Sequence, residues 1–362
     1  MRRTLAAAAL ALAAAPPASA QEGVLHIYNW SDYMAPDTVA RFEAETGIRV
    51  VYDVYDSNEM LEAKMLTGAS GYDLVVPTSA FLQRQLAAGV YQPLDVAKLP
   101  NLANMDPVLM AQAAAYDPDN AHSVIYMWGT IGLGFDVEKV RERLGADAPT
   151  DSWSLIFDPA NAAKLADCGI SVLDSANEVL PSALAYLGLD PTTADEAALT
   201  QAAALLEAIR PHIRYFHSSQ YISDLANGEI CVALGYSGDM FIAADRAEAA
   251  GTGVEIDYAI PKEGAMQWFD LMAIPADAPN PDAAHAFIDF VMRPEIVADI
   301  TNFVYFASAN APAMALIDPA IRDDPSIFPS AEVLAKLFPQ VTRDARTDRT
   351  ITRLWTRVRT GQ

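Results

Sequence analysis

Apolar and polar positions form two recurring patterns in the first part of the chain. Short apolar runs predict three strands, at residues 24–27, 48–54 and 74–76. Apolar side chains at helical spacing predict three helices, at residues 36–45, 58–66 and 80–88. A strand–helix alternation of this kind predicts a doubly wound α/β lobe with right-handed crossovers.

The same alternation resumes after a glycine-containing extended run at residues 125–135. Three further strands are predicted near residues 169–173, 213–219 and 230–234, and a fourth at 254–260. Helices are predicted at residues 137–144, 179–187, 195–209, 223–227 and 281–292. The chain therefore has the length and pattern of two α/β lobes, with the first crossing between them at residues 125–135.

The first twenty residues have the pattern of a secretory signal peptide. Arg2 and Arg3 precede an apolar stretch, residues 5–15, that is too short to span a bilayer. The sequence Ala18-Ser19-Ala20 matches an A-x-A cleavage site, so we expect the mature chain to begin at Gln21. This pattern predicts an exported, soluble protein.

The charge and cysteine content narrow the classes of partner and cofactor. The chain has 24 basic and 47 acidic residues and a formal net charge of −23, which argues against a nucleic-acid partner. No histidine or cysteine cluster has metal-ligand spacing, so no metal or other cofactor is expected. Cys168 and Cys231 each lie beside or within an apolar, strand-like run. In an exported protein they form either one disulfide or two buried thiols.

Aromatic and acidic side chains recur together where predicted strands end. The first such place is Tyr28-Asn29-Trp30-Ser31-Asp32-Tyr33, between a strand and a helix start. A carboxylate flanked by aromatic faces suits an organic cation, although core aromatics and a helix cap at Asp32 would give the same pattern. The chemistry recurs at Glu178, at Tyr236 with Asp239, and at Trp268 with Asp270. In open α/β sheets, ligands bind at the carboxyl ends of strands.

Acids at several strand ends, divided between two lobes, would hold a diamine or polyamine by both of its ends. An amino acid would also need an arginine or amide clamp for its carboxylate. One alternative is an exported hydrolase that uses paired carboxylates, against which no nucleophile elbow, zinc motif or phosphate loop is visible. A second alternative is a binding protein for another cationic small molecule, such as agmatine or cadaverine.

Long stretches of the sequence resemble the periplasmic putrescine- and spermidine-binding proteins of ABC importers. These stretches are LHIYNWSDYMAPDTVARFEAETGI, YDSNEMLEAKM with GYDLVVPTSAFL, IRYFHSSQYISDLANGEICVALGYSGD, and IPKEGAMQWFD. The resemblance covers nearly the whole mature chain. It implies a type II periplasmic binding protein fold, with two lobes of mixed sheet flanked by helices around a hinge cleft. We place lobe 1 at residues 21–133 plus 261–309 and lobe 2 at 134–260 plus 310–362.

The resemblance also implies how the protein works. It implies a periplasmic binding protein without catalytic activity, which delivers its ligand to an inner-membrane ABC permease and the ATPase of that permease. A monomer is expected, because the hinge must open and close. A disulfide between Cys168 and Cys231 is implied as well.

The ligand contacts that the resemblance implies are Trp30, Ser31, Asp32, Tyr33, Thr78, Glu178, Ser218, Tyr236, Asp239, Trp268, Asp270, Phe306 and Gln340. Three of them depart from the putrescine-binding pattern: Thr78 replaces serine, Tyr236 replaces tryptophan and Phe306 replaces tyrosine. Trp268 and Gln340 instead resemble spermidine binders. The pattern is therefore mixed, and it leans towards a protein that binds both amines.

Overall fold

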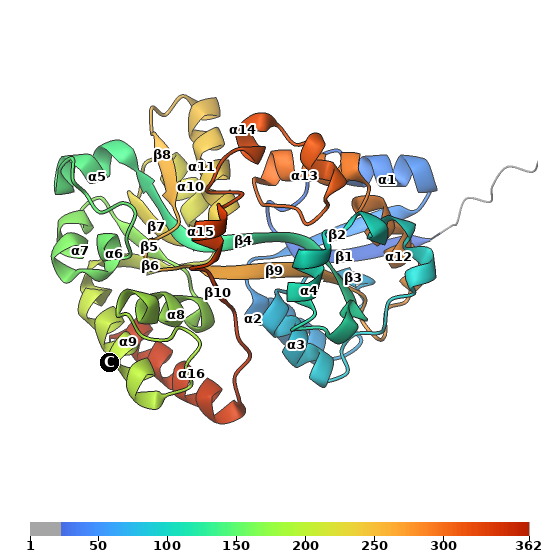
Figure 1. Ribbon diagram of the computed structural model, residues 1–362, viewed down its shortest axis with the longest axis horizontal. Helices are drawn as coiled ribbons and strands as arrows, with labels where there is room; N and C mark the ends of the chain where they lie inside the picture. Colours follow the sequence, from blue (N-terminus) through green and yellow to red (C-terminus); the bar gives the residue numbers. More distant parts are fainter. Residues whose placement is uncertain (1–22, 362) are drawn as a thin grey trace, which may run out of the picture.

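Strand β4 (Ser123–Asp136) connects the two halves of the molecule. The computed structural model describes residues 23–361. In it, β4 pairs antiparallel with β9 (Met266–Ala273) as far as Thr130, and with β7 (Val232–Tyr236) from Ile131 onward. Figure 1 shows β4 and β9 running across the middle of the molecule, with one α/β lobe on either side. The two-lobed mixed α/β architecture expected from the sequence is confirmed.

The first lobe has a mixed sheet with parallel strands at its edge. Strand β1 (Val24–Trp30) pairs parallel with β2 (Arg49–Tyr55) and with β3 (Leu74–Val75), and β3 meets β9 antiparallel. Its α-helices are α1 (Thr38–Thr46), α2 (Asn58–Leu66), α3 (Ser79–Ala87), α4 (Pro107–Ala113), α12 (Pro281–Val291) and α13 (Pro294–Val304). Its short 3-10 turns are η1 (Val96–Lys98), η2 (Pro100–Asn104) and η3 (Pro118–Asn120).

The second lobe repeats this design. Strand β5 (Ile170–Val172) lies parallel between β6 (Ile213–Phe216) and β7, and β8 (Ile256–Ala259) pairs with the end of β4. Its helices are α5 (Val137–Leu144), α6 (Ser154–Phe157), α7 (Pro159–Leu165), α8 (Ala176–Tyr186), α9 (Glu196–Ile209), η4 (Arg210–His212), α10 (Tyr221–Ala226) and α11 (Ser237–Ala250). A disulfide joins Cys168 to Cys231, as the resemblance implied.

The C-terminal segment contacts both lobes. The turn η5 (Pro312–Ala315) packs against α13, and it is followed by α14 (Pro319–Arg322) and α15 (Ala331–Leu334). Strand β10 (Phe338–Pro339) then pairs parallel with β9, and α16 (Ala345–Thr360) packs against α8 and α9. The lobe boundaries proposed from the sequence stay predictions, including the assignment of residues 310–362 to lobe 2.

Most predicted elements lie within a few residues of the observed ones, but residues 294–306 differ. None of the predicted elements covers residues 294–304, which form α13, and Tyr305 caps that helix in the left-handed region. The extended backbone begins only afterwards, where Ala307 bridges to Trp128. Within residues 23–361, no helix is both long and apolar enough to cross a membrane. The predicted signal peptide lies outside the described residues.

Candidate ligand-binding site between the lobes

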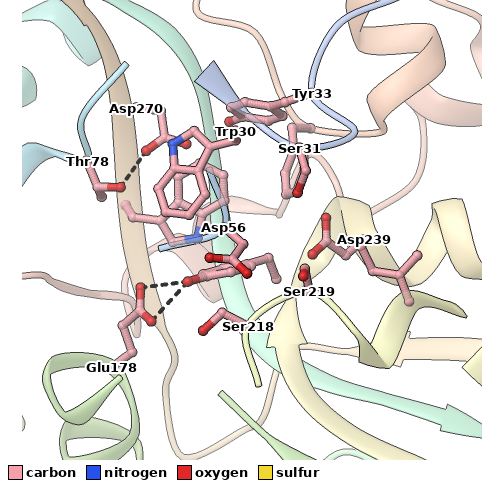
Figure 2. Close-up of a pocket in the computed structure, with 14 residues that line it drawn as sticks. Trp30, Ser31, Tyr33, Asp56, Thr78, Glu178, Ser218, Ser219, Asp239 and Asp270 are labelled. Carbon is pink, nitrogen blue, oxygen red and sulfur yellow. Dashed lines mark hydrogen bonds between the residues drawn. The ribbon is translucent and has the colours of Figure 1, made fainter. Parts of the chain in front are cut away.

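A pocket lies between the lobes, where strands of both sheets end. The empty space between its lining residues measures about 470 Å³, and part of it is open to solvent. Its lining residues are Trp30, Ser31, Tyr33, Asp56, Thr78, Glu178, Ser218, Ser219, Ile222, Tyr236, Asp239, Trp268, Asp270 and Phe306. Figure 2 shows them around one space, with Asp270 and Thr78 on one side and Glu178 and Ser218 on another.

Asp270, on β9, is buried at the first-lobe side of the pocket. Its carboxylate accepts a hydrogen bond of 2.6 Å from Thr78 Oγ1, and Thr78 Oγ1 in turn accepts one of 2.9 Å from Asn58 Nδ2. Burial raises the pKa of Asp270 to about 7, while the hydrogen bond from Thr78 opposes that rise. Because the hydroxyl proton of Thr78 is directed at Asp270, the free carboxylate oxygens are oriented before any ligand arrives.

Asp239 lies in the first turn of α11, on the second-lobe side. The hydroxyl of Tyr221, on α10, donates a hydrogen bond to Asp239 Oδ2 and accepts one of 3.2 Å from the Tyr236 amide. Burial raises the pKa of Asp239 to about 7, and the negative charge of Asp32 adds to the rise. Tyr221 therefore holds two lining residues in place, although it does not line the pocket itself.

Glu178 lies in the first turn of α8 and is buried at the third corner of the pocket. The Tyr236 hydroxyl lies 3.1 and 3.0 Å from its two carboxylate oxygens and donates to them. Burial raises the pKa of Glu178 to about 8, and the negative charge of Glu59 raises it further. A cation that entered here would favour the ionised form and would reverse this shift.

Aromatic rings from both lobes form the walls between these acids. The ring centroids of Trp268 lie 6.0 Å from Tyr236 and 5.2 Å from Phe306, and those of Trp30 and Tyr236 lie 6.2 Å apart. Edge-to-face packing of this kind leaves π-faces available to methylene groups and cations. A side chain at Gly129 on β4 would come within 2.7 Å of Trp268, so the crossing strand needs glycine at this position.

Two predicted contacts do not line the pocket. Asp32 adopts a φ of 55°, and its carboxylate forms an ion pair of 2.7 Å with Arg246 on α11. Gln340 is buried, and its side-chain amide has no hydrogen-bond partner among the described residues; it lines a small adjoining cavity with Phe81 and Asn177. The roles of both as ligand contacts stay predictions.

Three lining residues were missed by the sequence reasoning: Asp56, Ser219 and Ile222. Asp56 follows the last residue of β2, so it satisfies the criterion, an acid at a strand end, that selected the other carboxylates. Ser219 is the neighbour of the predicted Ser218. No pattern singles out Ile222, which lies in the short helix α10.

The sequence profile of a family described as bacterial extracellular solute-binding protein matches residues 37–329. This chain belongs to that family. As a member of a solute-binding family it is a binding protein and not an enzyme, and the hydrolase considered from the sequence is not favoured.

Individual relatives match this chain over almost its whole length. It is 54% identical over 361 residues to the putrescine-binding periplasmic protein SpuD of Pseudomonas aeruginosa (strain UCBPP-PA14), covering 99% of this chain and 98% of that protein. It is 52% identical over 359 residues to the putrescine-binding periplasmic protein PotF of Escherichia coli (strain K12), covering 99% and 97%. A similar crystal structure is the spermidine/putrescine ABC transporter substrate-binding protein PotD of Streptococcus pneumoniae, with a TM-score of 0.77, 26% identity, and coverage of 94% and 99%.

Proposed function

We propose that this protein is the polyamine-binding component of an ABC importer and that it captures putrescine and related amines in the interlobe pocket. The observation that carries the proposal is the charge of the lining: four carboxylic acids, and no lysine, arginine or histidine among the described residues that form it. The names of the two relatives above 50% identity support the same ligand class.

The three acids with raised pKa values each pair with an ammonium group of a diamine. Asp270 and Asp239 pair with one ammonium group, and Glu178 pairs with the other. The rings of Trp30, Tyr236, Trp268 and Phe306 enclose the methylene chain between them. Each ring that faces an ammonium contributes about 0.5–2 kcal/mol. The predicted contacts Ser31, Tyr33, Thr78 and Ser218 complete the polar lining.

Binding of the amine is coupled to ionisation of the pocket. The raised pKa values of Asp239, Asp270 and Glu178 mean that these groups hold protons near neutral pH when the ligand is absent. A cationic amine favours the carboxylates, so its entry releases protons. The hydroxyls of Thr78, Tyr221 and Tyr236 already point at the carboxyl oxygens and need no reorientation.

The cellular setting belongs to the same proposal. A periplasmic location agrees with the names of the relatives. We propose that the chain is cleaved after Ala20, acts as a monomer, and delivers its ligand to an inner-membrane permease and its ATPase. Agmatine and cadaverine are cations of the same class and are the alternative ligands.

A thermal-shift screen of the dialysed mature protein tests the ligand class. The panel contains putrescine, cadaverine, agmatine, spermidine, spermine, common amino acids and sugars. A ligand present at 100 times its dissociation constant stabilises the folded state by about 2.7 kcal/mol, so amines should raise the melting temperature and the other compounds should not. No shift with any amine, from protein shown to be ligand-free, would refute the proposal.

A further inference from the structure

Asp56 differs from the other acids of the pocket in having no partner among the described residues. Asp270 accepts a hydrogen bond from Thr78, Glu178 from Tyr236, and Asp239 from Tyr221. Among residues 23–361, the Asp56 carboxylate has no hydrogen-bond donor within 3.5 Å and no basic group within 4.0 Å. It is a pocket-lining charge that the protein itself does not compensate.

The backbone around Asp56 places this charge in the pocket lining. Asp56 stands between the last residue of β2 and Ser57, the N-cap of α2. Figure 2 shows its carboxylate pointing into the pocket below Trp30, between Glu178 on one side and Ser219 and Asp239 on the other. The free carboxylate thus lies between two of the other acids of the pocket.

Space continues beyond the chain neighbours of Asp56 and Glu178. A second groove is lined by Ser57 and Glu59 from the first lobe and by Ala176 and Asn177 from the second. These residues are the chain neighbours of Asp56 and Glu178, so two short segments, 56–59 and 176–178, separate the pocket from the groove. A ligand that extends past Glu178 would pass beside Asp56.

Amines of different length differ in the number of positive charges that the pocket must pair. A diamine carries two positive charges, which Asp239, Asp270 and Glu178 are sufficient to pair. In the proposed arrangement two of these acids share one ammonium group, so the third ammonium group of a triamine has no acid of its own among them. We infer that Asp56 binds the terminal ammonium of a triamine and so determines the length of amine that the site accepts. This inference rests on the proposed function, and it concerns a residue that the family resemblance did not assign.

The test is isothermal titration of Asp56→Asn with putrescine and with spermidine. Loss of one ammonium partner should weaken spermidine binding at least tenfold, which corresponds to about 1.4 kcal/mol. Putrescine binding should change less than threefold. Asp56→Glu, which keeps the charge, should retain the spermidine affinity.

The matched control is Asp119→Asn, which removes the same charge from the same lobe. Asp119 is exposed and has a φ of 60°, a conformation that asparagine adopts readily, so this variant should bind both amines like the wild type. The melting temperature of each ligand-free variant checks that the fold is intact.

The outcomes that would overturn the inference are distinct. Equal losses for both amines would mean that Asp56 contributes only to the general field of the pocket. Unchanged spermidine binding, or a wild type that binds putrescine and not spermidine, would also overturn it while leaving the proposed function standing. A wild type that binds no amine would refute the proposed function and the inference with it.

Discussion

Replacing Asp270 with asparagine is the most direct test of how the pocket holds a cation. Asp270 is only 4% exposed, so its charge is poorly screened by water. Asparagine keeps the shape, and its side-chain oxygen can still accept the hydrogen bond from Thr78 Oγ1. The substitution therefore removes the charge with little change in packing.

The size of the effect follows from burial and from the pKa. Leaving one buried charge unpaired costs on the order of 2–5 kcal/mol, so at pH 8 we expect Asp270→Asn to weaken putrescine binding by roughly thirtyfold or more. At pH 6 the wild type must first ionise a carboxyl whose pKa is about 7, at a cost of about 1.4 kcal/mol. The difference between wild type and variant should therefore shrink about tenfold.

The same substitution has the opposite effect on the empty protein. Because folding raises the pKa of Asp270, its contribution to stability is fully present below the unfolded value near 3.8 and is lost as the pH rises through about 7. Asparagine does not titrate, so at pH 8 the ligand-free variant should melt no lower than the wild type.

Titration calorimetry at pH 6 and pH 8, with melting curves of the ligand-free proteins, measures both effects. Affinity within threefold of the wild type at pH 8 would refute the role of Asp270 as an ammonium partner. A variant that melts well below the wild type would instead show that Asp270 is needed for folding.

Three further predictions concern the other acids. Putrescine affinity should rise between pH 6 and pH 8, because the acids of the pocket must ionise to bind a cation. Calorimetry near pH 7 in buffers of different ionisation enthalpy should report a net release of protons on binding. An uptake of protons would contradict the raised pKa values. Tyr221→Phe removes a hydrogen bond to Asp239 and should weaken amine binding by about 0.5–1.5 kcal/mol at an unchanged fold, and an unaltered affinity would remove Tyr221 from the site. Arg246→Gln breaks the half-exposed ion pair with Asp32, and such pairs contribute about 0–1 kcal/mol to stability. A double-mutant cycle with Asp32→Asn should therefore yield a coupling free energy within that range. A larger coupling free energy would mean that this pair controls closure of the lobes.

The rule that acids at strand ends form the candidate site selected many of the residues that line the pocket, because it depends only on chain order. Glu178, Asp239 and Asp270 each follow or lie within an apolar run, and the sheet brings them to one pocket. The rule applied equally to Asp56, which could have been found in the same way. The two-lobed fold was predictable for a similar reason, since alternating periodicities determine which segments form the sheet.

The remaining contacts depend on the directions of side chains, which the spacing of residues along the sequence does not determine. Asp32 stands in the opening motif, but its left-handed backbone directs the carboxylate to Arg246, more than two hundred residues along the chain. Tyr221 has no neighbour in sequence that marks it as the partner of Asp239. Such contacts arise only when two helices of the second lobe pack together, as α10 and α11 do.

The crossing strand β4 also has a mechanical consequence. It is paired along most of its length, with β9 on the first-lobe side and with β7 and β8 on the second-lobe side. The lobes are therefore joined by a hydrogen-bonded ribbon rather than by a slack tether, so a change in their relative orientation has to bend or twist this ribbon. Such a joint resists sliding of one lobe past the other, because sliding would break the pairing of β4 with its neighbours.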